Sequence, residues 1–517
     1  MAKVLKSRAV TPQYMPQNQL SIEGFESPFE RSLDPNNRWI QLSNLIPWDE
    51  ICNIYLNQNK KSDTGRTPLS PRLVLGSIII KHLCNLDDRE VVLQITENPY
   101  LQYFLGYSNF STTPPFDASL MVHFRQRLGA ENVNKINEKI VELKTHMEAL
   151  PTKNEEANSD KVSGEDSGDK PDEPENPNKG RLICDATACP QDIAFPTDLN
   201  LLSDARVKTE ELIDILYNSS LHSEKPRTYR KIARKRYLNT AQKKNKHHKV
   251  IRKAVRTQLA YVNRNLKSID WLLDSYKEFP LSHQQQRYLW IIQTLYEQQK
   301  QMWDTRTHTI EHRIVSIHQP HVRPIVRGKS QSKVEFGAKI HVSLIDGISF
   351  LDELSWDAYN EGMHLMKYIE KYKKRFGFYP REVLADQIYC TRANRAALKE
   401  KNIKLLGKPL GRPSAVQIHV SPGERNPIEG KFGQAKTGYG LNRIKARLKG
   451  TSEVWIACII LVLNLVKLAG AALHDLLMEI NASFSASNLN ASMVQIHDNI
   501  VNRLIEIMRL EYNAPKS

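Results

Sequence analysis

The chain has 517 residues, of which 40 % are hydrophobic and 25 % are charged, and its formal net charge is +16. This composition is normal for a soluble globular protein, and the length predicts two or three domains. The six cysteines are scattered without a CxxC pair or zinc-type spacing, which argues against a zinc protein and favours free thiols in a reducing compartment.

Residues 1–150 are predicted to form an all-helical domain. Pro71, preceded by a serine, is typical of a helix start, and a second helix is predicted from about Asp87. A third, basic helix follows and exposes Arg125 and Arg127. Short helices that end in a basic one fit a DNA-binding module, in which both arginines would contact DNA. A plain helical bundle fits the pattern nearly as well.

Residues 151–180 differ sharply from what precedes them. They hold four prolines, nine acidic and four basic residues and almost no apolar side chains. Such a segment cannot bury enough apolar surface to fold. We expect an acidic, disordered linker here, followed by a catalytic domain at 181–480 and a helical tail at 481–517.

The catalytic region predicts a mixed α+β or α/β fold, with helices on the faces of a mixed sheet. A helical insertion at about 207–328 interrupts it and is too long for a loop, so it must be a subdomain. The dipeptide Asp346-Gly347 predicts a hairpin turn. Strands are expected at about 181–187, 193–195, 334–345, 348–351, 383–385 and 403–406, and helices at 360–375, after 386, from 429 and at 455–473.

The net positive charge is concentrated in one block of the insertion. Between Lys225 and Arg256 there are fourteen Lys or Arg and no Asp or Glu. A block of this kind usually faces a polyanion, whereas the alternative is a solvated helix face. We expect a nucleic acid to be the partner. The candidate contacts in the block are Lys231, Arg234, Lys235 and Arg236.

The longest apolar stretch runs from Trp455 to Leu473 and contains Asn464 and Lys467. A lysine at the centre of a membrane span costs roughly 2.5–3.5 kcal/mol, and the stretch barely reaches the ~20 residues that a span needs. We expect a buried core helix. Because the amino terminus also lacks the apolar core of a signal peptide, we expect a cytoplasmic protein with no membrane partner.

Three carboxylates stand out as candidates for catalysis. Asp185 and Asp386 each end an apolar run that reads as a buried strand, and Glu429 lies at the start of a helix. Aspartates at the ends of neighbouring strands meet at one sheet edge and repel each other unless a divalent cation such as Mg²⁺ binds between them. Each residue also has an ordinary alternative, namely a turn aspartate, an N-cap and a capping-box glutamate respectively.

Two cations flank Glu429. Arg425 precedes it by four residues, and Lys436 follows it by seven, which puts Lys436 on the same helix face. Such a carboxylate suits a metal site that also grips phosphate. The histidines at 318, 321 and 341 fit no helical metal motif and are interpreted as surface or core residues. Other acids near the expected strands compete for the role: Asp192, Asp198, Asp346, Asp352, Glu353, Asp357 and Glu361.

The segments around these acids resemble the DDE-type transposases of bacterial insertion sequences. The stretch from Asp185 to Asp198 is similar to their first-aspartate region, and the stretch from Leu384 to Arg395 is similar to their second. The third region of one subgroup carries a Tyr-x2-Arg-x3-Glu-x6-Lys signature. Here Arg425, Glu429 and Lys436 match its spacing, and Pro422 replaces the tyrosine.

The resemblance implies an RNase H-like catalytic fold with a long helical insertion, preceded by a helical DNA-binding domain. It also implies metal-dependent cleavage of DNA at the element ends and strand transfer into target DNA. Asp185, Asp386 and Glu429 would bind two Mg²⁺ or Mn²⁺ ions, and Arg425 and Lys436 would hold the phosphates. The partners implied are the terminal inverted repeats, target DNA and a second copy of the chain. A metal-dependent nuclease, or an inactive DNA-binding relative, remains the alternative.

Overall fold

The computed structural model describes residues 33–58, 69–148, 177–326, 334–407 and 426–486. Pro422, Arg425, most of the expected linker and residues 487–517 of the expected tail lie outside the described residues. Internal contacts divide the chain into two compact units, Met1–Asn464 and Leu465–Ser517. The first unit contains the sheet, the insertion and the helices that precede them.

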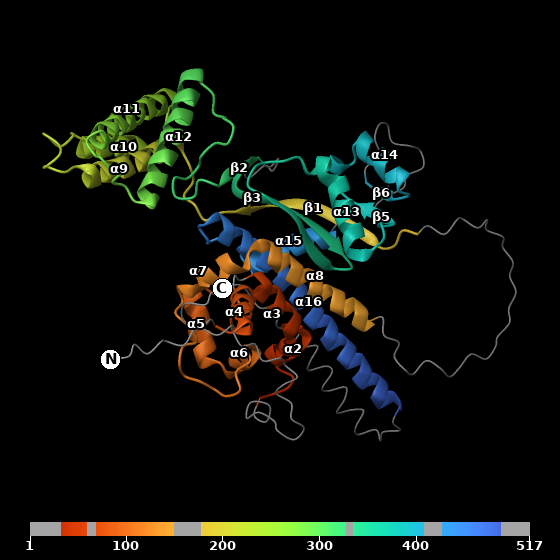
Figure 1. Cartoon of the computed structure of the whole chain (residues 1–517). Coiled ribbons are helices and arrows are strands. Elements are labelled where there is room, and N and C mark those ends of the chain that lie inside the picture. Colours follow the sequence, from red (N-terminus) through yellow and green to blue (C-terminus); the bar gives the residue numbers. More distant parts are fainter. Residues whose placement is uncertain (1–32, 59–68, 149–176, 327–333, 408–425, 487–517) are drawn as a thin grey trace, which may run out of the picture. The chain divides into compact units, whose positions relative to one another are not determined.

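The amino-terminal region is helical, as predicted (Figure 1). Asp87 caps the helix Asp88–Glu97 by accepting hydrogen bonds from the backbone N–H groups of Arg89 and Glu90. In the core, Trp48 meets Phe104 edge to face with ring centroids 5.1 Å apart. The helices are α2 (Arg38–Leu45), α3 (Trp48–Gln58), α4 (Pro71–Leu83), α5 (Asp88–Glu97), α6 (Pro99–Phe104), α7 (Leu120–Leu128) and α8 (Ala130–Glu148).

A six-stranded mixed sheet follows, with the order β2-β3-β1-β5-β6 and β4 paired to β3. Strand β1 is antiparallel to β3 and parallel to β5, which is itself parallel to β6. Asp346 and Gly347 both have positive φ, at 49° and 80°, and form the predicted turn between β3 and β4. The strands are β1 (Arg181–Pro190), β2 (Arg323–Val326), β3 (Val334–Ile345), β4 (Ile348–Ser355), β5 (Glu382–Leu384) and β6 (Lys404–Leu406).

The prediction of a strand at 193–195 is wrong. Gln191 forms an isolated bridge with Ile444, and the chain then leaves the sheet without regular structure until Thr197 caps the next helix. Phe195 is 72 % exposed, so its apolar side chain is not part of a buried strand. The apolar pattern of three residues is too short to distinguish a strand from the entry to the insertion.

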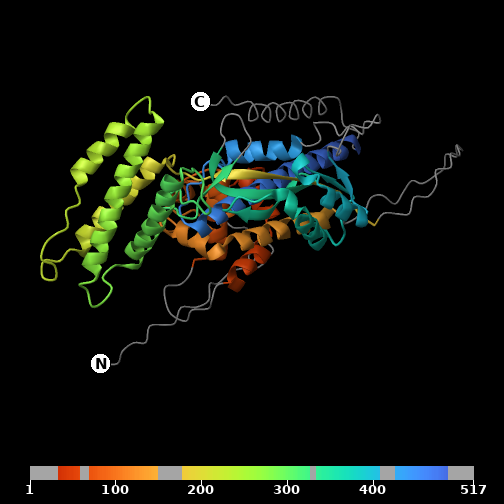
Figure 2. The same cartoon turned by 90° about the horizontal axis from the view of Figure 1, so that it is seen from above.

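The insertion is a helical bundle with a core of its own (Figures 1 and 2). Its bounds differ from the predicted 207–328, because the first helix begins at Asp198 and Arg323–Val326 is a strand of the sheet, β2. Its buried side chains come from α9, α11 and α12, with Leu202, Val262 and Ile292 fully buried. The insertion returns to the sheet where the Gln319 side chain donates to the backbone carbonyl of Asp192, at 3.4 Å. The helices are α9 (Asp198–Leu216), α10 (Arg230–Ala241), α11 (His248–Leu273) and α12 (His283–Thr305).

Helices cover both faces of the sheet. One face carries a core that joins β1 and β5 to α13 (Leu365–Phe376) and α14 (Arg392–Glu400). Helix α15 (Asn426–Gly438) contacts β1 as well. Two short 3₁₀ helices, η2 (Glu361–His364) and η3 (Gln387–Tyr389), contact each other beside β5.

The apolar helix α16 (Lys449–Ala486) is built into the protein. Its segment Lys449–Gly470 is long and apolar enough to cross a membrane, but 72 % of the apolar window is buried inside the structure. Asn464 is fully buried and satisfied, because its side chain accepts from Ser349 N at 2.8 Å and donates to Ser349 O at 2.7 Å and to Asn137 Oδ1 at 2.8 Å. The prediction of a core helix is confirmed up to this residue.

Candidate active site

Asp185 and Asp386 follow directly on the paired part of two neighbouring parallel strands. Ile183 of β1 is paired in parallel with Leu384 of β5, and each aspartate lies two residues further along its own chain. Side chains two residues apart point to the same face of a sheet, and neighbouring strands lie about 4.8 Å apart. Asp185 lies within β1 and is half-buried, whereas Asp386 follows the end of β5 and is exposed.

Backbone N–H groups orient both carboxylates. Asp185 Oδ1 accepts from the N–H of Ala186 at 2.8 Å, and Asp386 Oδ1 accepts from the N–H of Gln387 at 2.6 Å. Asp386 is thereby the N-cap of η3, so the ordinary alternative considered for it is also realised. Capping ties the carboxylate to a short helix that is itself firmly held.

Two buried residues, Asn394 and Gly362, hold the short helix η3 against η2. Asn394 Nδ2 donates to the carbonyl oxygens of Gly362, at 2.7 Å, and of Tyr389, at 2.9 Å. A Cβ on Gly362 would lie 2.2 Å from the carbonyl oxygen of Ile388, so only glycine allows this approach. The sequence analysis missed Gly362 as a positioning residue, since one glycine gives no local signal of what packs against it.

Glu429 lies on the first turn of α15, whose Ile428, Phe432 and Ala435 are buried. Glu429 is exposed, and Lys436 is partly exposed two turns further on. Among the described residues, no group of three His, Cys, Asp or Glu side chains is close enough together to hold a metal ion. Within the described part of the chain, Asp185, Asp386 and Glu429 therefore do not form a ready-made metal site in this structure.

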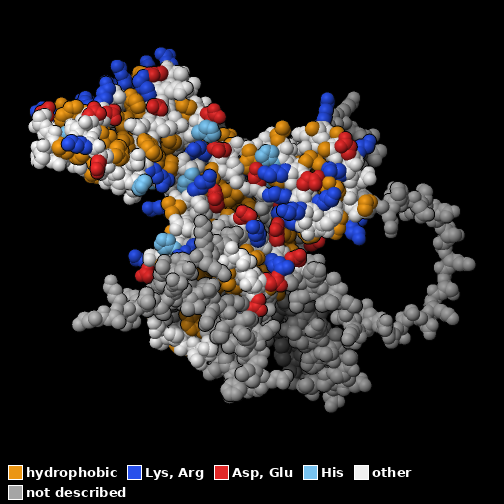
Figure 3. Space-filling model, viewed as in Figure 1, with side chains coloured by type: hydrophobic (Ala, Val, Ile, Leu, Met, Phe, Trp, Pro, Cys, Tyr) orange, Lys and Arg blue, Asp and Glu red, His pale blue; other side chains and the backbone are white. Residues whose placement is uncertain are grey.

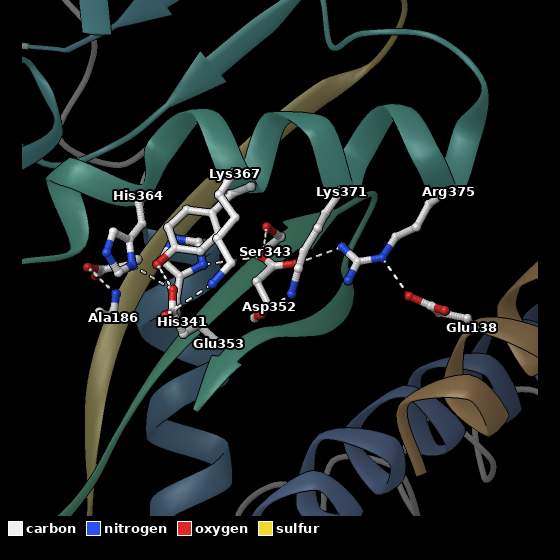
Figure 4. Close-up of polar contacts among 12 residues, drawn as sticks. Glu138, Ala186, His341, Ser343, Asp352, Glu353, His364, Lys367, Lys371 and Arg375 are labelled. Carbon is white, nitrogen blue, oxygen red and sulfur yellow. Dashed lines mark hydrogen bonds and ion pairs between the residues drawn. The ribbon is translucent and has the colours of Figure 1, made fainter. Parts of the chain in front are cut away.

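A buried polar network is centred on Asp352 of β4 (Figure 4). Its carboxylate accepts from His341 Nδ1 at 3.2 Å, from Ser343 and from Arg375 at 2.7 Å, and Arg375 also reaches Glu138 of α8 at 2.8 Å. Burial alone would raise the pKa of Asp352, but His341, Arg375 and Ser343 outweigh it and lower the pKa to about 2. The network joins the sheet to the amino-terminal helices.

The rival carboxylates have structural roles. Glu353 accepts from Tyr368 and His364, so it belongs to the same packed region as Asp352 (Figure 4). Most of the others pair with a cation. The pairs are Asp192 with Arg443, Asp198 with Arg313, Asp357 with Arg323 and Glu361 with Lys339.

The histidines behave as predicted, as core or surface residues. His341 is fully buried and stacks on Tyr368 with ring centroids 3.4 Å apart. His321 meets the ring of Trp356 edge to face, and His318 contacts the Tyr288 hydroxyl. None of the three belongs to a metal-type group among the described residues.

The prediction that Arg125 contacts DNA is wrong for this structure. Arg125 is 4 % exposed and makes a two-pronged ion pair with Asp88, at 2.9 and 2.7 Å. Lys81 joins Asp88 at 2.8 Å, and both cations lie over the ring of Trp455. Burial would raise the pKa of Asp88, but the two cations lower it to about 2. The sequence shows that α7 is basic, but only the packing of α7 shows that Arg125 points into the protein rather than to solvent.

The remaining candidate DNA contacts are accessible. Arg127 is exposed at the end of α7. The four candidates on α10, Lys231, Arg234, Lys235 and Arg236, are all exposed as well. Lys and Arg side chains gather along an edge of the insertion (Figure 3). This charge distribution suits a polyanionic partner.

Comparisons with known proteins agree with this picture. Residues 383–466, which include Asp386 and Glu429, match the family model of the transposase DDE domain. Residues 27–127 match that of a transposase domain (DUF772). The uncharacterised protein ORF8 in the nfe locus of Rhizobium meliloti is 29 % identical over 177 residues, which cover 34 % of this chain and 73 % of that protein. No solved structure matches.

Proposed function

We propose that this chain, a DDE-type transposase of the insertion-sequence kind, cuts DNA at the ends of a mobile element and joins the freed 3′-hydroxyl to target DNA. The observation that supports the proposal most is the parallel pairing of β1 with β5, in which Ile183 and Leu384 are partners and each precedes its aspartate by two residues. The third acid, Glu429, lies within a segment that matches the transposase DDE domain. An RNase H-like fold agrees with this mixed sheet flanked by helices.

The donors fit divalent metal in their chemistry. Asp185, Asp386 and Glu429 offer hard carboxylate oxygens, which are the ligands of Mg²⁺ and Mn²⁺. Bound metal would activate the attacking oxygen and stabilise the leaving one. The two aspartates would hold the ions from the sheet, and Glu429 would complete the site from α15. The Glu429 side chain is exposed to solvent on the first turn of that helix.

Catalysis of this kind asks little of the protein beyond positioning and neutralising charge. Asp386 is fixed by its cap on η3, and Asp185 by its place within β1. Lys436, and Arg425 just before α15, would hold phosphates beside the scissile bond, since guanidinium and ammonium groups bind phosphate oxygens. The exposed cations of the insertion would hold the rest of the DNA. We expect a dimer on paired ends, acting in the bacterial cytoplasm.

Strand transfer distinguishes this proposal from a nuclease of the same fold. Pre-cut labelled element ends are incubated with plasmid and Mg²⁺, and joined products are sought on a gel. A transposase gives labelled plasmid, whereas a nuclease degrades the end without joining it. An inactive relative would do neither, although it would still bind the end.

A further inference from the structure

The longest helix of the insertion carries a row of cations on its exposed side. On α11 the exposed cations are Lys249, Lys253, Arg256, Arg264 and Lys267, which we call the α11 stripe. Their separations of four, three, eight and three residues follow the helical repeat, so all five lie on one side. The opposite side is the apolar face that fills the core of the insertion.

The α11 stripe is unusual in its lack of acidic neighbours along the helix. The first acidic residue of α11 is Asp270, which lies beyond the last cation of the stripe. A solvated helix face normally mixes both signs in pairs three or four residues apart, which lowers self-repulsion. Five like charges on one side therefore favour an external anion. At 1.5 Å per residue the stripe is about 27 Å long, a length along which one DNA strand carries about eight phosphates.

The helix is built to contact phosphates rather than to read bases. Base readout requires a helix that enters the major groove and presents groups such as Asn or Gln to base edges. Helix α11 packs against α9, α10 and α12, which leaves only a narrow strip of it exposed. Its Gln258 and Asn265 are each 1 % exposed, because they point into the bundle.

Two further features define where this surface ends. Arg264 lies over the ring of Tyr229, with its guanidinium 4.8 Å from the ring centroid, which fixes the side chain in place. Arg264 and Lys267 of the stripe also line a hollow of about 510 Å³, together with Trp271 and Glu224. The carboxylate of Glu224 makes this end of the stripe less favourable for an anion than the end near Lys249.

We propose that the α11 stripe holds duplex DNA through its phosphates, without regard to base sequence. This inference rests on the proposed function, because it takes DNA as the substrate. According to this proposal, α11 contributes to the affinity for DNA in general but not to the preference for the ends of the element. That preference must come from other parts of the chain.

The test compares two variants, one that lacks three positive charges of the α11 stripe and one that lacks three exposed lysines outside it. The stripe variant is Lys249→Gln/Lys253→Gln/Lys267→Gln, and the control is Lys277→Gln/Lys374→Gln/Lys399→Gln, whose lysines are also exposed. Binding of the full chain to two duplexes, one with an element end and one of unrelated sequence, is measured from 50 to 200 mM salt. Thermal unfolding of both variants checks that the fold is kept.

Three lost phosphate contacts should make the slope of log affinity against log salt shallower by about 2.7. Across this fourfold salt range the parent should then lose about 40-fold more affinity than the stripe variant. Both duplexes should be affected equally, and the control should match the parent. An unchanged slope in a folded stripe variant would overturn the proposal. So would a loss confined to the end-bearing duplex, which would mean base readout, or, in a parallel titration with duplex RNA of the unrelated sequence, tighter binding of RNA than of DNA.

These results are separate from the proposed chemistry. A chain that binds both duplexes through the stripe but never joins ends would keep this inference and refute strand transfer. Active strand transfer with an unchanged salt slope in the stripe variant would do the reverse.

Discussion

A methyl group on Gly362 would lie 2.2 Å from the carbonyl oxygen of Ile388. The glycine belongs to η2 and the isoleucine to η3, the short helix that Asp386 caps. The missing side chain of Gly362 therefore decides where η3 lies, and η3 decides where the Asp386 carboxylate points.

Gly362→Ala should push η3 away and move Asp386 without changing it. Overpacking of this kind costs about 1–3 kcal/mol of stability. Cleavage should slow, and the Mg²⁺ concentration that gives half-maximal cleavage should rise, while DNA affinity stays the same. Gly450→Ala is the control, because a methyl there meets nothing within 4 Å. A folded Gly362→Ala protein with an unchanged Mg²⁺ titration would show that η3 does not position the carboxylate.

Asp386→Asn should abolish cleavage and leave DNA binding intact or stronger. The amide keeps the size of the side chain but loses the negative charge that would hold the metal and repel phosphate. Cleavage of a labelled end and a gel-shift titration measure the two effects. Asp274→Asn, at an exposed position after α11, should behave as the parent. Full cleavage by the Asp386 variant would remove this residue from the site.

Asp352→Asn should lower stability and change its dependence on pH. The pKa of Asp352 falls from 3.8 to about 2 in the folded protein, so its ionised form stabilises the fold above about pH 4. That contribution is lost as the pH falls toward 2. Breaking a buried ion pair costs roughly 3–5 kcal/mol. Urea unfolding at pH 7 should show the loss in the variant.

The same experiment between pH 4 and pH 2 should show a shallower fall in stability for the Asp352 variant than for the parent. Asp357→Asn, at a carboxylate that is 61 % exposed, is the control and should follow the parent. Equal pH profiles for parent and Asp352 variant would mean that the ionised carboxylate does not support the fold.

Arg125→Met should lower the stability of the fold, whereas Arg127→Gln should lower the affinity for DNA. Arg125 is buried against Asp88, so its loss should cost roughly 3–5 kcal/mol, toward the lower figure because Lys81 remains. Arg127 is exposed, so its loss should weaken DNA binding with little effect on thermal unfolding. A stable Arg125→Met protein with weakened DNA binding would instead show that Arg125 contacts DNA, as the sequence predicts.

Replacing Lys231, Arg234, Lys235 and Arg236 by Ala should weaken binding to the element end. If all four contact phosphates, the salt slope should become shallower by about 3.6. The three-lysine control variant of α13, α14 and the loop after α11 serves here too. An unchanged slope would show that this side of α10 faces something other than DNA.

The sequence predicted most elements because their signals were local. The Asp346-Gly347 turn, the helix that begins near Asp87 and the strand that begins near residue 181 each follow from neighbouring residues. The parallel pairing of the strands that carry Asp185 and Asp386 agrees with the prediction, but Asp185 does not end its strand, because β1 continues to Pro190. The catalytic role of both aspartates stays a prediction. The errors arose where a distant partner decides the outcome.

Arg125 is the clearest example of such an error. Its basic helix reads as a DNA contact, but Asp88 and Trp455, far away in sequence, bury it. The role of Gly362 depends likewise on Ile388. Asp352 looked like one acid among several, and only the packing of β3, β4 and α13 makes it the centre of a network.

The two ends of the insertion meet beside the sheet, where Gln319 reaches Asp192. Since β1 and β3 pair along their whole register on one side of this junction, the sheet closes without any help from the bundle. Shortening or replacing the bundle between these two points should therefore leave the pairing of β1 with β3, and the backbone around Asp185, in place.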